Sequence, residues 1–155
     1  MQKNLPDILK GKTVIVGIGN TLRGDDGAGP ALIAQVAGKV KAVCIDAGTS
    51  PENYAGKITQ QAPDTILLVD ALHLECEAGA YEILTKDEIL NSGFSTHDLS
   101  PRMFIEYLEQ QTQAEIYLLG IQPQTIAFGQ EISPEVKQAI EQISTQIQNK
   151  CMRHI

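Results

Sequence analysis

The chain has 155 residues, 43% of them hydrophobic, and a formal net charge of −7 at pH 7. This length suits one domain with a proper core, and no apolar run approaches the roughly 18 to 20 residues that a membrane helix needs. The acidic balance argues against nucleic acid as a partner, because nucleic-acid binding requires a basic face.

The cysteine pattern and the polar N-terminal segment favour an intracellular domain. Cys44, Cys76 and Cys151 are too few and too scattered for a disulfide framework, which favours a reduced, cytoplasmic setting. We expect a single domain over residues 1–155, in which 1–10 form an N-terminal extension without the apolar block of a secretory signal. Residues 150–155 are expected to fray.

Strand-like and helix-like patterns alternate along the chain. Residues 13–18 predict a buried strand bounded by glycines, and Gly29-Pro30 begins a helix. Ser100-Pro101 and Ser133-Pro134 each resemble an N-cap followed by proline at the first helical position. Further strands are predicted over 40–45, 65–69, 80–84 and 115–121, of which 80–84 is the more polar and suits a sheet edge. This alternation predicts an α/β fold: a three-layer α/β/α sandwich with a mostly parallel sheet.

A glycine-rich turn follows the first strand. Residues 17–29 read GIGNTLRGDDGAG, and such a turn after a strand normally holds a phosphate. Here Asp25 and Asp26 stand where a phosphate loop carries lysine, and Leu22 stands where a dinucleotide fingerprint needs its third glycine. Carboxylates repel phosphate and attract cations, so we expect no nucleotide. Of the two acids, Asp26 is the candidate ligand, and Asp25 is expected to stay solvated.

Acidic residues lie at or just beyond the ends of the first three predicted strands: Asp26, Asp46 and Asp70. In open α/β sheets, ligands bind beyond the carboxyl ends of the strands, where the strand order reverses. The short crossovers suggest the order 2-1-3, which would bring Asp26 and Asp70 together. Asp26 could instead cap the following helix, Asp70 could be a solvated acid, and Asp46 could bind a cofactor ribose.

His97 is the third candidate, because it lies in a polar loop where a histidine has little packing to do. Two carboxylates and one imidazole suit zinc, nickel or a similar divalent ion and leave coordination positions open. His73 with Cys76 supplies only two ligands, and Ser95 lies too close to His97 to act as a nucleophile elbow.

With these residues in place, the chain resembles the [NiFe]-hydrogenase maturation endopeptidases of the HycI/HybD type, and within them the hydrogenase 3 (HycI-type) group. The matching stretches run from about residue 12 to the last helix: GIGNxL with GDDGAGP at 17–30, DAGxxPEN at 46–53, VDA at 69–71, STH at 95–97 and LGIQP at 119–123. Many members carry a second glycine where Ala47 stands.

The resemblance implies a phosphorylase/hydrolase-like α/β/α fold with a mixed, five-stranded sheet and one short antiparallel edge strand. It also implies an endopeptidase that removes a C-terminal peptide from the hydrogenase large-subunit precursor once nickel is inserted, with Asp26, Asp70 and His97 as metal-binding and catalytic residues. The nickel would come with the precursor, so that cleavage checks nickel loading. The rival hypotheses are a non-catalytic chaperone for the nickel-loaded precursor and a nucleotide-binding α/β protein.

Overall fold

The computed structural model describes residues 3–92 and 101–152. Thirteen helices and strands follow one another in these described residues. They are α1 (Leu5–Ile8), β1 (Thr13–Ile18), the 3₁₀ helix η1 (Gly24–Gly27), α2 (Ala28–Val36), β2 (Val43–Gly48), the 3₁₀ helix η2 (Pro51–Tyr54), α3 (Ala55–Gln60), β3 (Thr65–Ala71), β4 (Tyr81–Thr85), α4 (Lys86–Ser92), α5 (Pro101–Gln111), β5 (Glu115–Ile121) and α6 (Pro134–Lys150).

The five strands form one mixed sheet in the order β2-β1-β3-β5-β4. β1 pairs in parallel with both β2 and β3, β3 pairs in parallel with β5, and β4 runs antiparallel at the edge. The predicted mostly parallel sheet with an antiparallel edge strand is therefore confirmed, as is the placement of the first strand between the second and third.

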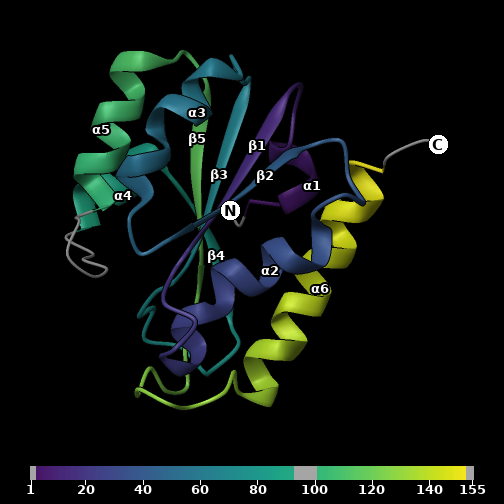
Figure 1. Cartoon of the computed structure of the whole chain (residues 1–155), viewed down its shortest axis with the longest axis vertical. Coiled ribbons are helices and arrows are strands. Elements are labelled where there is room, and N and C mark those ends of the chain that lie inside the picture. Colours follow the sequence, from purple (N-terminus) through teal and green to yellow (C-terminus); the bar gives the residue numbers. More distant parts are fainter. Residues whose placement is uncertain (1–2, 93–100, 153–155) are drawn as a thin grey trace.

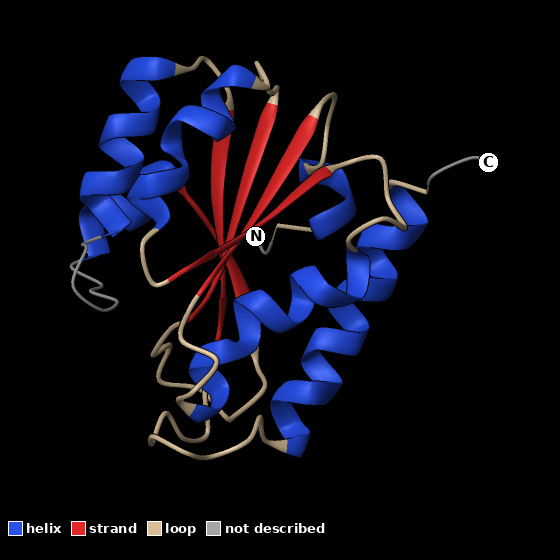
Figure 2. Ribbon diagram, viewed as in Figure 1, coloured by secondary structure: helices blue, strands red, loops and turns tan. Residues whose placement is uncertain are grey.

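Helices cover both faces of the sheet and complete three layers (Figures 1 and 2). Alternate residues of β1 face opposite ways, as the period of a strand requires. Ile15 packs in the core shared with α1, α2 and α6, whereas Val14 and Val16 pack in the core shared with α3, α4 and α5. All six residues of β1 are buried, as expected of a strand that is covered on both faces.

Three predicted strands have shifted boundaries in the structure, and the smallest shift is that of the strand predicted over 80–84, which is β4 at Tyr81–Thr85. The second strand, predicted over 40–45, is β2 at Val43–Gly48, because Val40 instead forms an isolated antiparallel bridge with Met152. The third strand, predicted over 65–69, continues to Ala71 in β3. Asp46 and Asp70 therefore lie within β2 and β3, close to the carboxyl end of each strand, rather than beyond the strands.

Both predicted end segments contribute to the packed structure. Leu5, Ile8 and Leu9 of the N-terminal segment are buried, and they join the core beneath α2 and α6. In the tail, the carbonyl of Cys151 accepts a hydrogen bond from the Lys41 amide at 2.8 Å. Across residues 3–92 and 101–152, we find no helix with the length and apolar character to cross a membrane.

Candidate active site

The glycine-rich turn brings η1 and α2 against the carboxyl ends of β1 and β3. Gly29 lies so close to both strands that a Cβ there would stand 2.5 Å from the carbonyl oxygens of Ile18 and Val69. Gly19 has a φ of +148°, and a Cβ on it would collide with the Asp26 carbonyl oxygen. Glycine at these positions allows a close approach of backbone to backbone, which is its common use in such turns.

Asp26 lies in η1 and is only 2% exposed. Its Oδ2 accepts a hydrogen bond from the backbone amide of Asn20 at 2.9 Å, which fixes the carboxylate against the preceding loop. The capping alternative is wrong: the N-cap of α2 is Gly27, and α2 has no side-chain cap bond. Asp26 is thus a buried carboxylate whose position the turn itself determines.

Asp70 lies near the end of β3 and is also 2% exposed, so it is not a solvated acid. It stands opposite Gly120 of β5 in the parallel register. η1 contacts β3, so Asp26 and Asp70 occupy adjoining elements at the junction of β1 and β3. Burying a carboxylate costs free energy unless it is hydrogen-bonded, paired or bound to a metal, and two such groups on adjoining elements indicate a chemical role.

Asp25 is not solvated, contrary to the sequence-based expectation: it is fully buried. Its Oδ2 accepts hydrogen bonds from the amides of Gln124 and Thr125, at 2.8 and 3.3 Å, and from Ser133 Oγ at 2.9 Å. Its Oδ1 accepts a hydrogen bond from the Ser133 amide at 2.7 Å. Four donors around one carboxylate offset the cost of burying its charge.

The Asp25 contacts join three parts of the molecule. They fasten η1 to the segment after β5 and to the start of α6, where Ser133 Oγ also accepts a hydrogen bond from the Val136 amide. The predicted cap at Ser133-Pro134 is therefore confirmed, but it shares its hydroxyl with Asp25. Asp25 thus positions the turn that carries its neighbour Asp26.

The remaining sequence candidates form no metal-binding group in the described part of the chain. His97 lies outside the described residues. Asp46 is exposed, and its Oδ1 accepts a hydrogen bond from the Gly48 amide at 3.0 Å, which forms a local turn. His73 and Cys76 are exposed in the segment after β3. Within 3–92 and 101–152, no three His, Cys, Asp or Glu side chains converge as a metal-binding group.

Gln122 is a buried polar residue that lies in the matching stretch 119–123 but that the sequence did not predict as a site residue. Its Oε1 accepts a hydrogen bond from the Leu74 amide at 2.6 Å, and its Nε2 donates one to the Pro123 carbonyl at 3.2 Å. Gln122 thereby joins the segment after β3 to the segment after β5. Its place after the apolar run 115–121 and its membership of the stretch LGIQP were the available signals.

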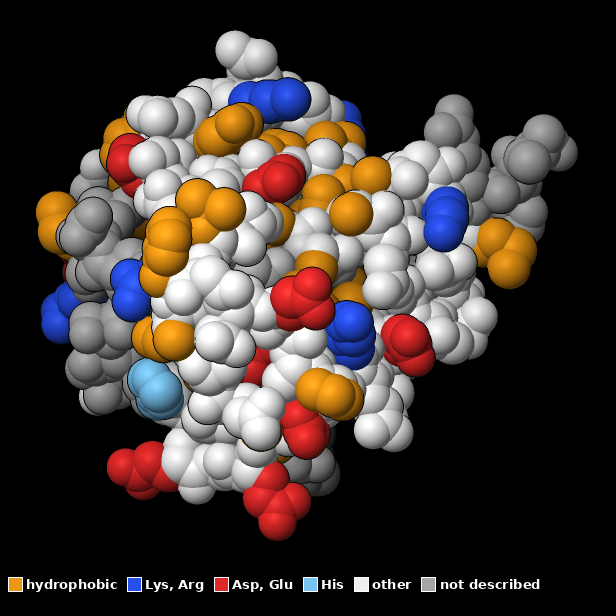
Figure 3. All heavy atoms as spheres, turned by 60° about the horizontal axis from the view of Figure 1, so that its bottom comes forward, with side chains coloured by type: hydrophobic (Ala, Val, Ile, Leu, Met, Phe, Trp, Pro, Cys, Tyr) orange, Lys and Arg blue, Asp and Glu red, His pale blue; other side chains and the backbone are white. Residues whose placement is uncertain are grey.

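The surface around the site is acidic. Figure 3 looks toward the end of the molecule where the parallel strands terminate, and Asp and Glu side chains are spread over the lower part of that view among few Lys and Arg. Four loops surround this end, at 19–27, 49–54, 72–80 and 122–133. They contain four exposed acidic residues, besides the buried Asp25 and Asp26, and a single Lys or Arg, Arg23.

Comparison with known proteins places this chain in a family. A family model described as hydrogenase maturation protease matches residues 31–150. A putative hydrogenase maturation protease of Methanocaldococcus jannaschii is 38% identical over 149 residues, which cover 88% of each chain. The hydrogenase 3 maturation protease of Escherichia coli K12 is 33% identical over 133 residues, which cover 84% of this chain and 85% of that protein.

Solved structures agree with the sequence comparison. The crystal structure of the [NiFe] hydrogenase maturation protease HycI from Thermococcus kodakarensis superposes with a TM-score of 0.87 at 33% identity. The superposition covers 94% of this chain and 97% of that one. The glycine-rich turn, the two buried aspartates on adjoining elements and the three-layer fold thus occur in a chain that belongs to the hydrogenase maturation protease family, a family of peptidases.

Proposed function

We propose that this protein is an endopeptidase that removes the C-terminal extension of a [NiFe]-hydrogenase large-subunit precursor after nickel insertion. The family is one support. The observation that carries the proposal is the pair of buried carboxylates, Asp26 and Asp70, on adjoining elements at the end of the sheet. Nickel is the cargo of the precursor in this proposal.

Asp26 and Asp70 would meet the nickel of the precursor as oxygen donors, with His97 as the nitrogen donor that the family resemblance implies. Carboxylate and imidazole ligands suit a divalent ion of this type. Binding the loaded ion would hold the adjacent peptide at the carboxyl edge of the sheet. Hydrolysis then forms a bond between a water oxygen and the peptide carbon, breaks the C–N bond, and transfers a proton to the leaving amine. Asp70 and His97 share the proton transfers, either as an aspartic-type pair or with help from the ion.

The test compares purified precursor with and without nickel. We expect the loaded precursor to lose a C-terminal fragment, seen as a mass decrease, and the nickel-free precursor to remain intact. Equal cleavage of both would remove nickel from the recognition step. Binding of loaded precursor without any mass change would instead support the chaperone.

Matched variants test whether Asp26 takes part in the cleavage reaction. Asp26→Asn keeps the size of the side chain and removes its charge, and we expect cleavage to fall on the order of a hundredfold or more. Asp46→Asn is the control, because Asp46 is exposed at the end of the neighbouring strand and bonds only locally. Activity of Asp26→Asn within a few-fold of the control would exclude Asp26 from the reaction.

A further inference from the structure

Two large apolar side chains stand exposed at the edge of the candidate site. Leu22 in the glycine-rich turn is 61% exposed, and Phe128 in the segment after β5 is 75% exposed. Single exposed apolar residues are common on protein surfaces and need no explanation. These two, however, lie on neighbouring loops, because the Gly129 amide donates a hydrogen bond to the Leu22 carbonyl at 2.8 Å.

The loops that carry Leu22 and Phe128 are firmly held. The Leu22 amide donates to Asn20 Oδ1 at 2.9 Å, and Arg23 Nε donates to the Ile126 carbonyl at 3.2 Å. The buried carboxylate of Asp25 fastens the same two loops from beneath. Both apolar side chains are therefore presented to solvent by an ordered backbone, and little conformational entropy is lost when they bind a partner.

The charge around this pair defines the partner further. In the four loops at this end, Glu52, Glu75, Glu77 and Glu131 are exposed. Arg23 is the single basic residue in those loops, and its Nε is already bonded to the Ile126 carbonyl. Such a surface repels an acidic segment and attracts one that carries lysine or arginine.

We propose that Leu22 and Phe128 are the docking contacts for the precursor segment next to the cleaved bond, and that this segment presents an apolar side chain with basic residues near it. This inference rests on the proposed function, because the occupant is the substrate of that reaction. The Asp26 amide donates a hydrogen bond at 3.0 Å to the carbonyl of Arg23, the residue after Leu22. A segment seated on Leu22 and Phe128 therefore lies next to the turn that carries Asp26. Leu22 and Phe128 act here in binding and specificity, without taking part in bond cleavage.

The test measures KM and kcat for the nickel-loaded precursor with the double variant Leu22→Ser and Phe128→Ser. We expect KM to rise about tenfold or more, since apolar contacts at an interface centre carry much of its affinity, and kcat to stay within about twofold of wild type. The control is Met152→Ser, which removes a side chain of similar exposure (55%) from the opposite end of the fold. A KM within about twofold of that control would overturn the proposal.

The salt dependence of KM tests the basic character of the docked segment. Raising NaCl from 50 to 500 mM is expected to increase KM for wild type by several-fold, because screening weakens the attraction between the glutamates and a basic segment. An unchanged KM would refute the basic character of the segment.

If the wild-type protein does not cleave the loaded precursor at all, the proposed endopeptidase activity is refuted. Binding of a fluorescent peptide from the precursor C-terminus then tests the docking surface by itself. Binding lost in the double variant would support that surface, and equal binding would refute it.

Discussion

Asp25 and Asp26 are neighbours with the same side chain but different hydrogen-bond partners. The Asp25 carboxylate accepts hydrogen bonds from four donors within the protein, whereas the Asp26 Oδ2 accepts one from the Asn20 amide. Both residues lie in η1, which contacts β3. The difference arises from the geometry of η1, in which two successive side chains diverge. The Asp25 side chain reaches the segment after β5 and the start of α6, and the Asp26 side chain reaches the Asn20 amide.

Asp25→Ala is therefore expected to lower the free energy of unfolding by about 3 to 5 kcal/mol, since it leaves buried amide donors without an acceptor. Urea denaturation of the variant against Asp46→Ala measures the difference, because Asp46 is exposed and bonds only to Gly48. Equal midpoints for the two variants would contradict the role of Asp25 as the fastening of the site turn.

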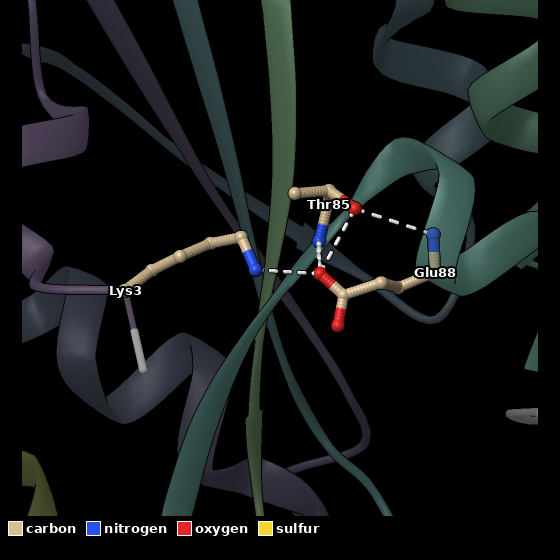
Figure 4. A network of polar contacts seen from close by, with 3 residues as sticks. All are labelled: Lys3, Thr85 and Glu88. Carbon is tan, nitrogen blue, oxygen red and sulfur yellow. Dashed lines mark hydrogen bonds and ion pairs between the residues drawn. The ribbon is translucent and has the colours of Figure 1, made fainter. Parts of the chain in front are cut away.

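At the scale of elements, α4 begins with a reciprocal capping box. Thr85 Oγ1 accepts a hydrogen bond from the Glu88 amide at 3.2 Å, and Glu88 Oε1 accepts one from the Thr85 amide at 3.1 Å (Figure 4). Lys3 Nζ pairs with the same Oε1 at 2.6 Å, which links the N-terminal segment to the start of α4. These contacts lower the pKa of Glu88 from 4.5 to about 2. The hydrogen bond from Lys3 is the largest cause, and the hydrogen bond from the Thr85 amide is the next.

A lowered carboxyl pKa adds stability above pH 4.5, and that stability disappears as the pH falls toward 2. Glu88 is 45% exposed, so the pair is worth only about 0.5 to 1 kcal/mol. Lys3→Met is expected to raise the Glu88 pKa toward 4.5 in a carboxyl NMR titration and to lose its destabilising effect near pH 2. Lys57→Met, an exposed change on α3, is the control and leaves that pKa in place. A Glu88 pKa unmoved by Lys3→Met would assign the shift to the capping box alone.

At the scale of the whole molecule, the N-terminal helix joins the core at the end of the fold opposite the candidate site. α1 lies beside the C-terminal half of α6 and away from the η1 turn (Figure 1). Leu5→Ala is expected to cost about 2 to 4 kcal/mol of stability, because Leu5 is 2% exposed in the core. Met103→Ala, at a 61% exposed position, should change stability by less than about 0.5 kcal/mol. Thermal melts of both variants provide the measurement, and similar midpoints would show that α1 packs only loosely.

Patterns within short windows predicted most of this fold. The strand at 115–121 matches β5, and the Ser133-Pro134 signal begins α6 as expected, because both depend on neighbours in sequence. The shift of the second strand and the burial of Asp25 could not be predicted in this way. Val40 pairs with Met152, and Asp25 bonds to Ser133, across more than a hundred residues each. Local periodicity carries no information about such distant partners.

The link between Asp25 and Ser133 spans 108 residues and has a consequence for biosynthesis. A ribosome releases the N-terminal half first, so Asp26 emerges long before the start of α6 is translated. Until Ser133 has left the exit tunnel, the Asp25 carboxylate lacks two of its four hydrogen-bond donors. The hydrogen bonds that hold the turn of Asp26 are therefore complete only after the start of α6 has been synthesised.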